Sequence, residues 1–214
     1  MARFDHRDRV EVVHRSFVMA PDLPTGDGIS QREVLRRVGK VGQAAEDYIR
    51  PIERLAWRDG LQPYEVMDRD MGNTELIHEF LAFAAEHGGN TEAWRRAYRD
   101  HFGKGRTLFS LDAVVAFATD LGFDAGEVRV ALTDRRYRDR VRADHQTALR
   151  LGARGVPFTV VDERYGLSGA QEIDTYLRVI TQAWDESPRV TLAGAPDADV
   201  CAETCTTDRR APRP

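Results

Sequence analysis

The spacing of apolar and polar residues divides the first part of the chain into an extended segment and a series of amphipathic helices. Residues 9–19 are rich in β-branched and aromatic side chains and run into a loop with two prolines, which predicts a strand that ends there. From Ser30, which can cap a helix, apolar residues recur at spacings of three and four as far as Ala56. This pattern predicts one amphipathic helix, weakened by Gly39 and Gly42.

A block of helices is predicted to follow this first helix. Thr74 is the expected cap of a strongly apolar helix that stops at a pair of glycines, Gly88 and Gly89. Glycines separate the later segments, each of which has its own apolar stripe. The remaining helices are expected at residues 91–102, 110–121, 125–132 and 137–151.

The pattern changes from helical to extended after Gly152. Residues 156–161 form a β-branched and aromatic run, turn-forming residues follow, and extended character resumes up to Ser168, which together predict a hairpin. Ser168 and Gln171 fit a capping box at the start of a last amphipathic helix. Residues 188–214 have too little apolar surface to offset the entropy of ordering, so we expect a flexible tail there.

These elements predict an α/β fold in which an all-helical block interrupts a small sheet. The expected sheet-containing domain comprises residues 1–29 and 138–187, and the expected helical insertion comprises residues 30–137.

Composition restricts the classes of function. The 214 residues are 42% hydrophobic, enough for a packed core, and the net charge of −4 leaves no basic block for nucleic acid or a membrane surface. No stretch is long and apolar enough to span a bilayer, and the charged N-terminal residues do not resemble a secretory signal, so a cytoplasmic location is expected. The only cysteines, Cys201 and Cys205, lie in the tail, so no disulfide framework is expected.

One motif is far more specific than the rest. Residues 155–161, Gly-Val-Pro-Phe-Thr-Val-Val, followed by Tyr-Gly-Leu-Ser-Gly-Ala-Gln at 165–171, resemble the cis-proline loop, the next two strands and the closing helix of DsbA-like proteins of the thioredoxin superfamily, especially the FrnE-type group. The resemblance implies that Gly155, Val156 and Pro157 bind substrate beside a reactive cysteine, with the Val156 backbone pairing to an incoming peptide. Taken alone, Pro157 also fits a strand that opens with an ordinary trans bond.

His78 is a further candidate for the substrate groove. Asn73 and Thr74, with His78 one turn on, resemble the FrnE-type pattern. The alternative is a capped helix that carries a surface histidine.

The chain departs from the family pattern at its N-terminal end. Family members begin with a strand and then carry Cys-x-x-Cys at the start of the first helix, where the helix dipole favours a thiolate. Residues 1–8 look instead like the end of that helix and the turn after it, so the central strand, the Cys-x-x-Cys and most of the helix are expected to be missing. Met1 is then either an internal methionine of a longer protein or the start of a form that has lost its catalysis. We favour the first, because loss of a central strand leaves Val10, Val12 and Phe17 poorly covered.

The tail cysteines form a Cys-x-x-x-Cys, the remaining candidate redox pair. Cys201 and Cys205 are near enough in sequence to form a small disulfide that exchanges with other thiols. The alternatives are metal binding, for which two ligands do not complete a tetrahedral site, and an incidental pair. The histidines show no metal-ligand spacing, so no metal site is predicted.

The resemblance implies a thiol-disulfide oxidoreductase of the DsbA/FrnE type, in a truncated or catalytically impaired form, that acts on protein or small-molecule thiols and disulfides without a cofactor. One alternative is an enzyme like the kappa-type glutathione transferases or 2-hydroxychromene-2-carboxylate isomerases, which would bring glutathione to the site. Another is a non-catalytic peptide-binding or chaperone-like module. The oligomeric state is not predicted.

Overall fold

The computed structural model describes residues 2–187, and its helices follow the apolar spacing of the sequence closely. The helices are α1 (Gln31–Arg37), α2 (Gln43–Arg58), α3 (Glu75–Glu86), α4 (Asn90–Tyr98), α5 (Leu111–Asp120), α6 (Ala125–Thr133), α7 (Arg138–Arg150) and α8 (Ile173–Glu186), with a 3₁₀ turn at Arg7–Arg9 and a π-helical turn at Arg99–Gly103. The strands are β1 (Ile29–Ser30), β2 (Asp70–Met71), β3 (Phe158–Val161) and β4 (Tyr165–Ser168).

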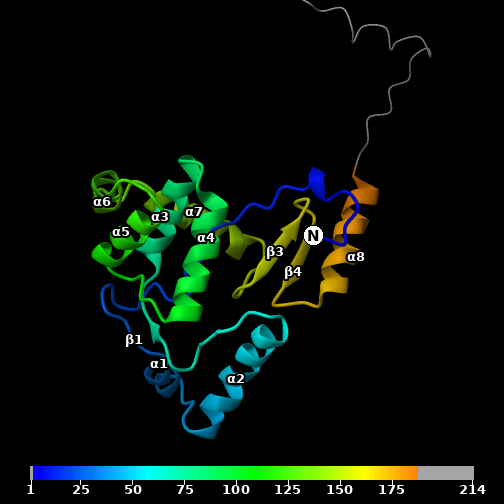
Figure 1. The fold of residues 1–214 in the computed structure, drawn as a ribbon. Helices are drawn as coiled ribbons and strands as arrows, with labels where there is room; N and C mark the ends of the chain where they lie inside the picture. Colours follow the sequence, from blue (N-terminus) through cyan, green and yellow to red (C-terminus); the bar gives the residue numbers. More distant parts are fainter. Residues whose placement is uncertain (1, 188–214) are drawn as a thin grey trace, which may run out of the picture.

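The elements gather in three groups. Helices α3 to α7 form a block, α1 and α2 lie below it, and the β3–β4 hairpin stands beside it with α8 on the far side (Figure 1). Among residues 2–187, no helix is long and apolar enough to cross a membrane.

The first predicted helix is wrong in one respect, because it is two helices. Gly39 and Gly42 have φ of +76° and +54°, and the segment between them is not helical. Such left-handed backbone ends a helix and is adopted most readily by glycine. The two glycines therefore separate α1 from α2, although the apolar spacing runs through them.

Side-chain caps fix the starts of several helices. The Ser30 hydroxyl accepts the backbone N–H of Glu33 at 3.2 Å, as predicted. Helix α3 differs, because Thr74 makes no side-chain cap and Asn73 Oδ1 accepts the Glu75 N–H at 2.8 Å. Thr74 therefore occupies the cap position, as predicted, but the side chain that accepts the hydrogen bond is that of Asn73.

The strand expected at residues 9–19 is also wrong. After the turn at Arg7–Arg9 the chain runs on without regular structure, and it pairs with no strand of the described part of the chain. A strand exists only through hydrogen bonds to a neighbour, so β-branched residues alone do not make one. The Ser16 N–H instead donates to Asp144 Oδ2 of α7 at 3.1 Å, which ties this segment to the helical block.

The predicted hairpin is confirmed, as the antiparallel pair β3–β4 with Phe158 opposite Ser168. The capping box after it is wrong. Gln171 Nε2 donates to the Ser168 carbonyl at 2.7 Å, and α8 begins only at Ile173, without a side-chain cap. A second small sheet, β1–β2, was not predicted, because strands of two residues have no detectable alternation.

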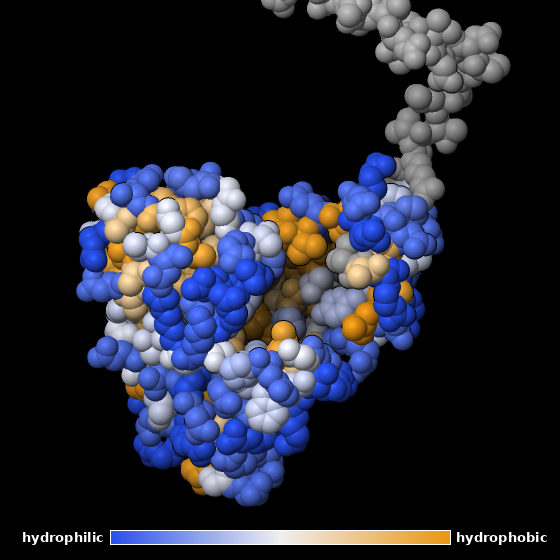
Figure 2. Space-filling model, viewed as in Figure 1, coloured by the Kyte–Doolittle hydropathy of each residue, from blue (hydrophilic) through white to orange (hydrophobic). Residues whose placement is uncertain are grey.

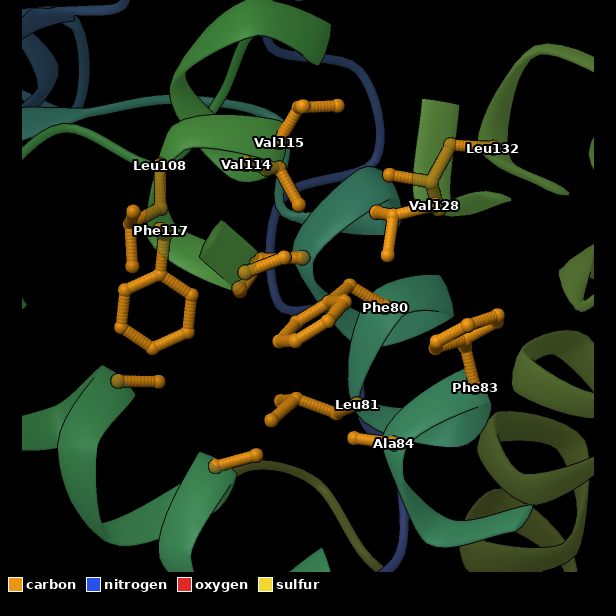
Figure 3. Close-up of a cluster of buried hydrophobic side chains, with 14 of the residues drawn as sticks. Phe80, Leu81, Phe83, Ala84, Leu108, Val114, Val115, Phe117, Val128 and Leu132 are labelled. Atoms are coloured by element: carbon orange, nitrogen blue, oxygen red, sulfur yellow. The ribbon is translucent and has the colours of Figure 1, made fainter. Parts of the chain in front are cut away.

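The main hydrophobic core lies inside the helical block. Phe80 of α3 and Phe117 of α5 are fully buried, with ring centroids 5.8 Å apart in an edge-to-face contact. Figure 3 shows the buried side chains that surround them: Leu81, Phe83 and Ala84 of α3, Leu108 just before α5, Val114 and Val115 of α5, and Val128 and Leu132 of α6. A smaller cluster around Leu35, Ile49 and Met67 holds α1 and α2.

Candidate functional site

The Gly155–Val156–Pro157 loop is anchored at both ends. Helix α7 ends at Arg150, the chain turns at Gly152, where φ is +91°, and the Ala153 N–H donates to the Ala148 carbonyl at 2.9 Å. Ala153 itself is buried. On the other side, the chain enters β3 at Phe158 directly after the loop. The loop is therefore held between a helix end and a strand, and the Val156–Pro157 peptide bond within it is cis.

The loop is open to solvent. Val156 is 49% exposed and Pro157 is exposed as well. The Pro157 carbonyl accepts the Gly169 N–H at 2.9 Å, whereas the N–H and carbonyl of Val156 form no hydrogen bond to any residue from 2 to 187. A Cβ added at Gly155 would meet nothing within 4 Å, so the fold sets no steric requirement for glycine there. Val156 thus presents a free donor and a free acceptor.

The adjoining edge of β3 is also unpaired within the described chain. Pro157 and Gly169 form a hydrogen-bonded pair, so in an antiparallel ladder Thr159 is the next residue bonded to β4. Phe158 and Val160 lie at the alternate positions, and their N–H and carbonyl groups face away from β4. The outer edge of β3 therefore has backbone groups available to another extended segment.

His78, the third candidate, lies in an aromatic cluster and not on the open surface. Its ring lies 5.5 Å from that of Trp94, and Nδ1 is buried without a hydrogen-bond partner among the residues described. Burial, with a smaller contribution from His145, lowers the pKa of His78 to about 4. The surface-histidine alternative is thus wrong, and among the described residues no hydrogen bond, ion pair or ring contact joins His78 to the Pro157 loop.

Two further histidines belong to this cluster. His14 stacks on Trp94 at 5.4 Å, and His145 of α7 lies 4.5 Å from the ring of Phe17. The Nδ1 atoms of both are buried without a partner in the described part of the molecule. Sequence reasoning did not find this grouping, because its members come from the N-terminal segment, α3, α4 and α7, far apart in the chain.

Positive charge gathers between α7 and the loop. Arg140 of α7 pairs with Glu86 at 3.0 Å. The other four arginines between residues 138 and 154 form no ion pair with any acid of the described chain, although most arginines elsewhere do. They are Arg138, Arg142, Arg150 and Arg154.

Hollows lie beside the hairpin and α8. Figure 2 shows one hollow, with apolar surface inside it, between the helical block and the hairpin unit, which comprises β3, β4 and α8. A second, of about 290 Å³, lies between Phe4 and the apolar face of α8, formed by Ile173, Tyr176 and Ile180. This second hollow does not include the Pro157 loop.

The tail cysteines, Cys201 and Cys205, lie outside the described residues. Within residues 2–187, no group of three or more histidine, aspartate or glutamate side chains has the arrangement of a metal site.

Comparison with known proteins identifies the family to which this fold belongs. A family model described as the DSBA-like thioredoxin domain matches residues 1–181, and the chain belongs to this family. A crystal structure of a probable DsbA oxidoreductase from Streptomyces coelicolor is 38% identical, with a TM-score of 0.81 over 92% of this chain and 86% of the other. The structure is thus a DsbA-like thioredoxin fold with a helical insertion, as the sequence predicted.

A second solved structure is more distant. The cytosolic disulfide reductase DsbM from Pseudomonas aeruginosa, solved with glutathione, is 20% identical, with a TM-score of 0.46 over 64% of this chain and 71% of the other. No curated protein matches the chain.

Proposed function

We propose that this chain takes part in thiol-disulfide exchange as a FrnE-type member of its family, and that the Val156–Pro157 loop binds the substrate peptide. The observation that carries the proposal is the free backbone of Val156 beside an unpaired edge of β3, in a chain of the DSBA-like family. An extended peptide can add to such an edge through main-chain hydrogen bonds, largely independent of its sequence.

The chemistry is a pair of exchange steps. A thiolate attacks one sulfur of a substrate disulfide, so that a mixed disulfide forms and the other substrate sulfur leaves as a thiolate. A second thiol then attacks the mixed disulfide and releases the substrate. The substrate gains two electrons and the dithiol becomes a disulfide, so no cofactor is required. We propose the cytoplasm as the compartment.

The proposal has two forms, which differ in where the reactive dithiol comes from. Residues 1–214 contain no Cys-x-x-Cys, and their only thiols are Cys201 and Cys205. In the first form, a strand from outside these residues pairs with Phe158 and Val160 at the outer edge of β3, and its Cys-x-x-Cys places the thiolate beside Pro157. The backbone of Val156 then remains available for the substrate peptide. In the second form, the tail pair itself undergoes the exchange.

Peptide binding tests the loop directly. The chain offers a matched control in Pro63, which is exposed like Pro157 but lies outside the loop. We expect Pro157→Ala to weaken the binding of an unfolded, alkylated peptide at least fivefold in calorimetry, and Pro63→Ala to leave it unchanged. Failure of the unmodified chain to bind, or equal losses in both variants, contradicts the proposal.

Insulin reduction separates the two forms. Residues 1–214 are expected to show no turnover if the dithiol comes from outside them. Turnover that disappears in Cys201→Ser assigns the reaction to the tail pair.

A non-catalytic peptide-binding or chaperone-like role is the second candidate, favoured by the lack of Cys-x-x-Cys in residues 1–214. It predicts peptide binding without turnover even when an in-frame upstream sequence is included. The transferase or isomerase alternative predicts glutathione-dependent activity, and upstream a serine in place of the dithiol.

A further inference from the structure

Three exposed arginines, on α7 and on the segment between α7 and Pro157, lack acidic partners. Arg142 and Arg150 lie on α7, and Arg154 precedes Val156 by two residues. None forms an ion pair with an acid of residues 2–187, and Arg150 donates only to the Thr147 hydroxyl, at 2.8 Å. We call these three residues the α7 basic surface.

Other charges nearby do not neutralise this surface. Asp144 of α7 already accepts the Ser16 N–H and lies 3.6 Å from Arg15. Asp139, the other acid of α7, contacts none of the three arginines. In a chain of net charge −4, the α7 basic surface is therefore a local excess of positive charge.

One stretch of the sequence after α8 carries the opposite charge, although residues 187–214 as a whole contain four arginines and four acids. Between Arg189 and Arg209 every charged residue is acidic, and these residues surround the two cysteines. They are Asp197, Asp199, Glu203 and Asp208.

Chain length allows this acidic segment to reach the loop. The Ser187 hydroxyl donates to Asp162 Oδ2 at 3.4 Å, so the chain leaves α8 beside the turn between β3 and β4. From that turn to Pro157, β3 covers roughly 17 Å at ~3.3 Å per residue. The residues from Ser187 to Cys201 span up to ~46 Å when extended, well beyond that distance.

We propose that the acidic segment 197–203 binds the α7 basic surface and thereby brings Cys201 to the Val156–Pro157 loop. Each exposed ion pair is weak, but the segment is tethered, so its local concentration at the surface is high. The contact is therefore expected to weaken with salt. This docking does not rest on the proposed exchange function, because it needs only complementary charge and reach.

Disulfide trapping tests the docking. In a Cys205→Ser background, Val156→Cys places a thiol in the loop, and oxidised glutathione converts it and Cys201 into an intramolecular disulfide with release of two reduced glutathione molecules. Ile52→Cys is the matched control: Ile52 is 46% exposed, and it lies on α2, which approaches α8 through Arg58 and Glu172 at 3.4 Å. We expect trapping at position 156 to be at least tenfold faster, measured by mass spectrometry of the monomer.

Charge reversal then tests whether the arginines of the α7 basic surface cause the faster trapping. Arg142→Glu with Arg154→Glu is expected to slow trapping at position 156 at least fivefold, as is half-molar salt. Arg54→Glu, at another exposed arginine without an acidic partner, is expected to have no effect. Equal trapping at positions 156 and 52, or trapping that is indifferent to charge reversal in variants with unchanged circular dichroism, overturns the proposal. Peptide binding to the loop is measured separately, so either result stands without the other.

Discussion

The helical block and the hairpin unit, comprising β3, β4 and α8, differ in how completely they bury their apolar surface. In the block, the Phe80 and Phe117 rings have no exposed surface. In the hairpin unit, only Ala183 of α8 is buried, and Ile173 is 65% exposed. The block therefore supplies most of the stability of the fold, whereas the hairpin unit keeps backbone and apolar surface available for binding.

The ion pairs of the helical block and of the hairpin unit differ in burial in the same way. Glu79 of α3 is fully buried and accepts a hydrogen bond from Arg135 at 2.7 Å. In the hairpin unit, Arg164 and Glu186 form a pair at 2.7 Å in which both side chains are over 40% exposed. A buried pair is sensitive to the loss of one partner, whereas an exposed pair contributes little.

The largest expected effect is a cavity in the block. Phe80→Ala removes a fully buried ring, and such changes cost about 3–5 kcal/mol. Phe158→Ala removes the same group from β3, where the side chain is only partly buried, and should cost less than half as much. Urea unfolding followed by circular dichroism measures both. Equal losses would mean that the two regions do not differ in packing.

The buried ion pair gives the next effect. Arg135→Ala leaves the Glu79 carboxylate buried without its partner, and we expect a loss of about 2–3 kcal/mol, below the full range for buried pairs because Arg135 is 32% exposed. Arg164→Ala should change the free energy of unfolding by about 0–1 kcal/mol. The difference between the two variants in urea unfolding is the test, and a larger loss for Arg164→Ala contradicts it.

The helical block could be predicted from the sequence more completely than the rest of the molecule. Helices of the block bury stripes that recur every three or four residues, so α3, α5 and α6 could be predicted from spacing alone. The structure of residues 9–19 could not be predicted in this way, because strand pairing depends on a neighbouring strand and not on local preference. The Pro157 loop was found through its motif, whereas the cluster of His14, His78 and His145 depends on tertiary contacts between distant segments.

Acid should destabilise the protein through His78. Burial lowers the pKa of His78 in the folded state to about 4, whereas an unfolded histidine titrates near 6.5, so the unfolded state binds more protons between these values. Stability is then greatest above about pH 6.5 and falls as the pH decreases toward 4. We expect a loss of about 2 kcal/mol between pH 7 and pH 5 from this residue.

Unfolding free energies of wild type and His78→Leu across this range measure the contribution. The variant should lose less stability on acidification than the wild type. His101, whose pKa is also lowered to about 4, chiefly by burial, titrates in both proteins and cancels in the comparison. Identical slopes would mean that His78 is not buried in its neutral form.

Helix caps produce the smallest expected effects and have opposite signs in the two regions. Asn73→Ala removes the cap of α3 and should cost about 1 kcal/mol, whereas Thr74→Ala should cost almost nothing, because Thr74 makes no cap. At α8, Glu172 occupies the cap position with extended backbone but no side-chain bond, so Glu172→Ser should stabilise the protein by about 0.5 kcal/mol. Thermal unfolding resolves such shifts. A gain at Glu172 equal to the loss at Asn73 would show that α8 is coupled to the stability of the block as strongly as α3 is, and the two regions would then unfold as one cooperative unit despite their unequal packing.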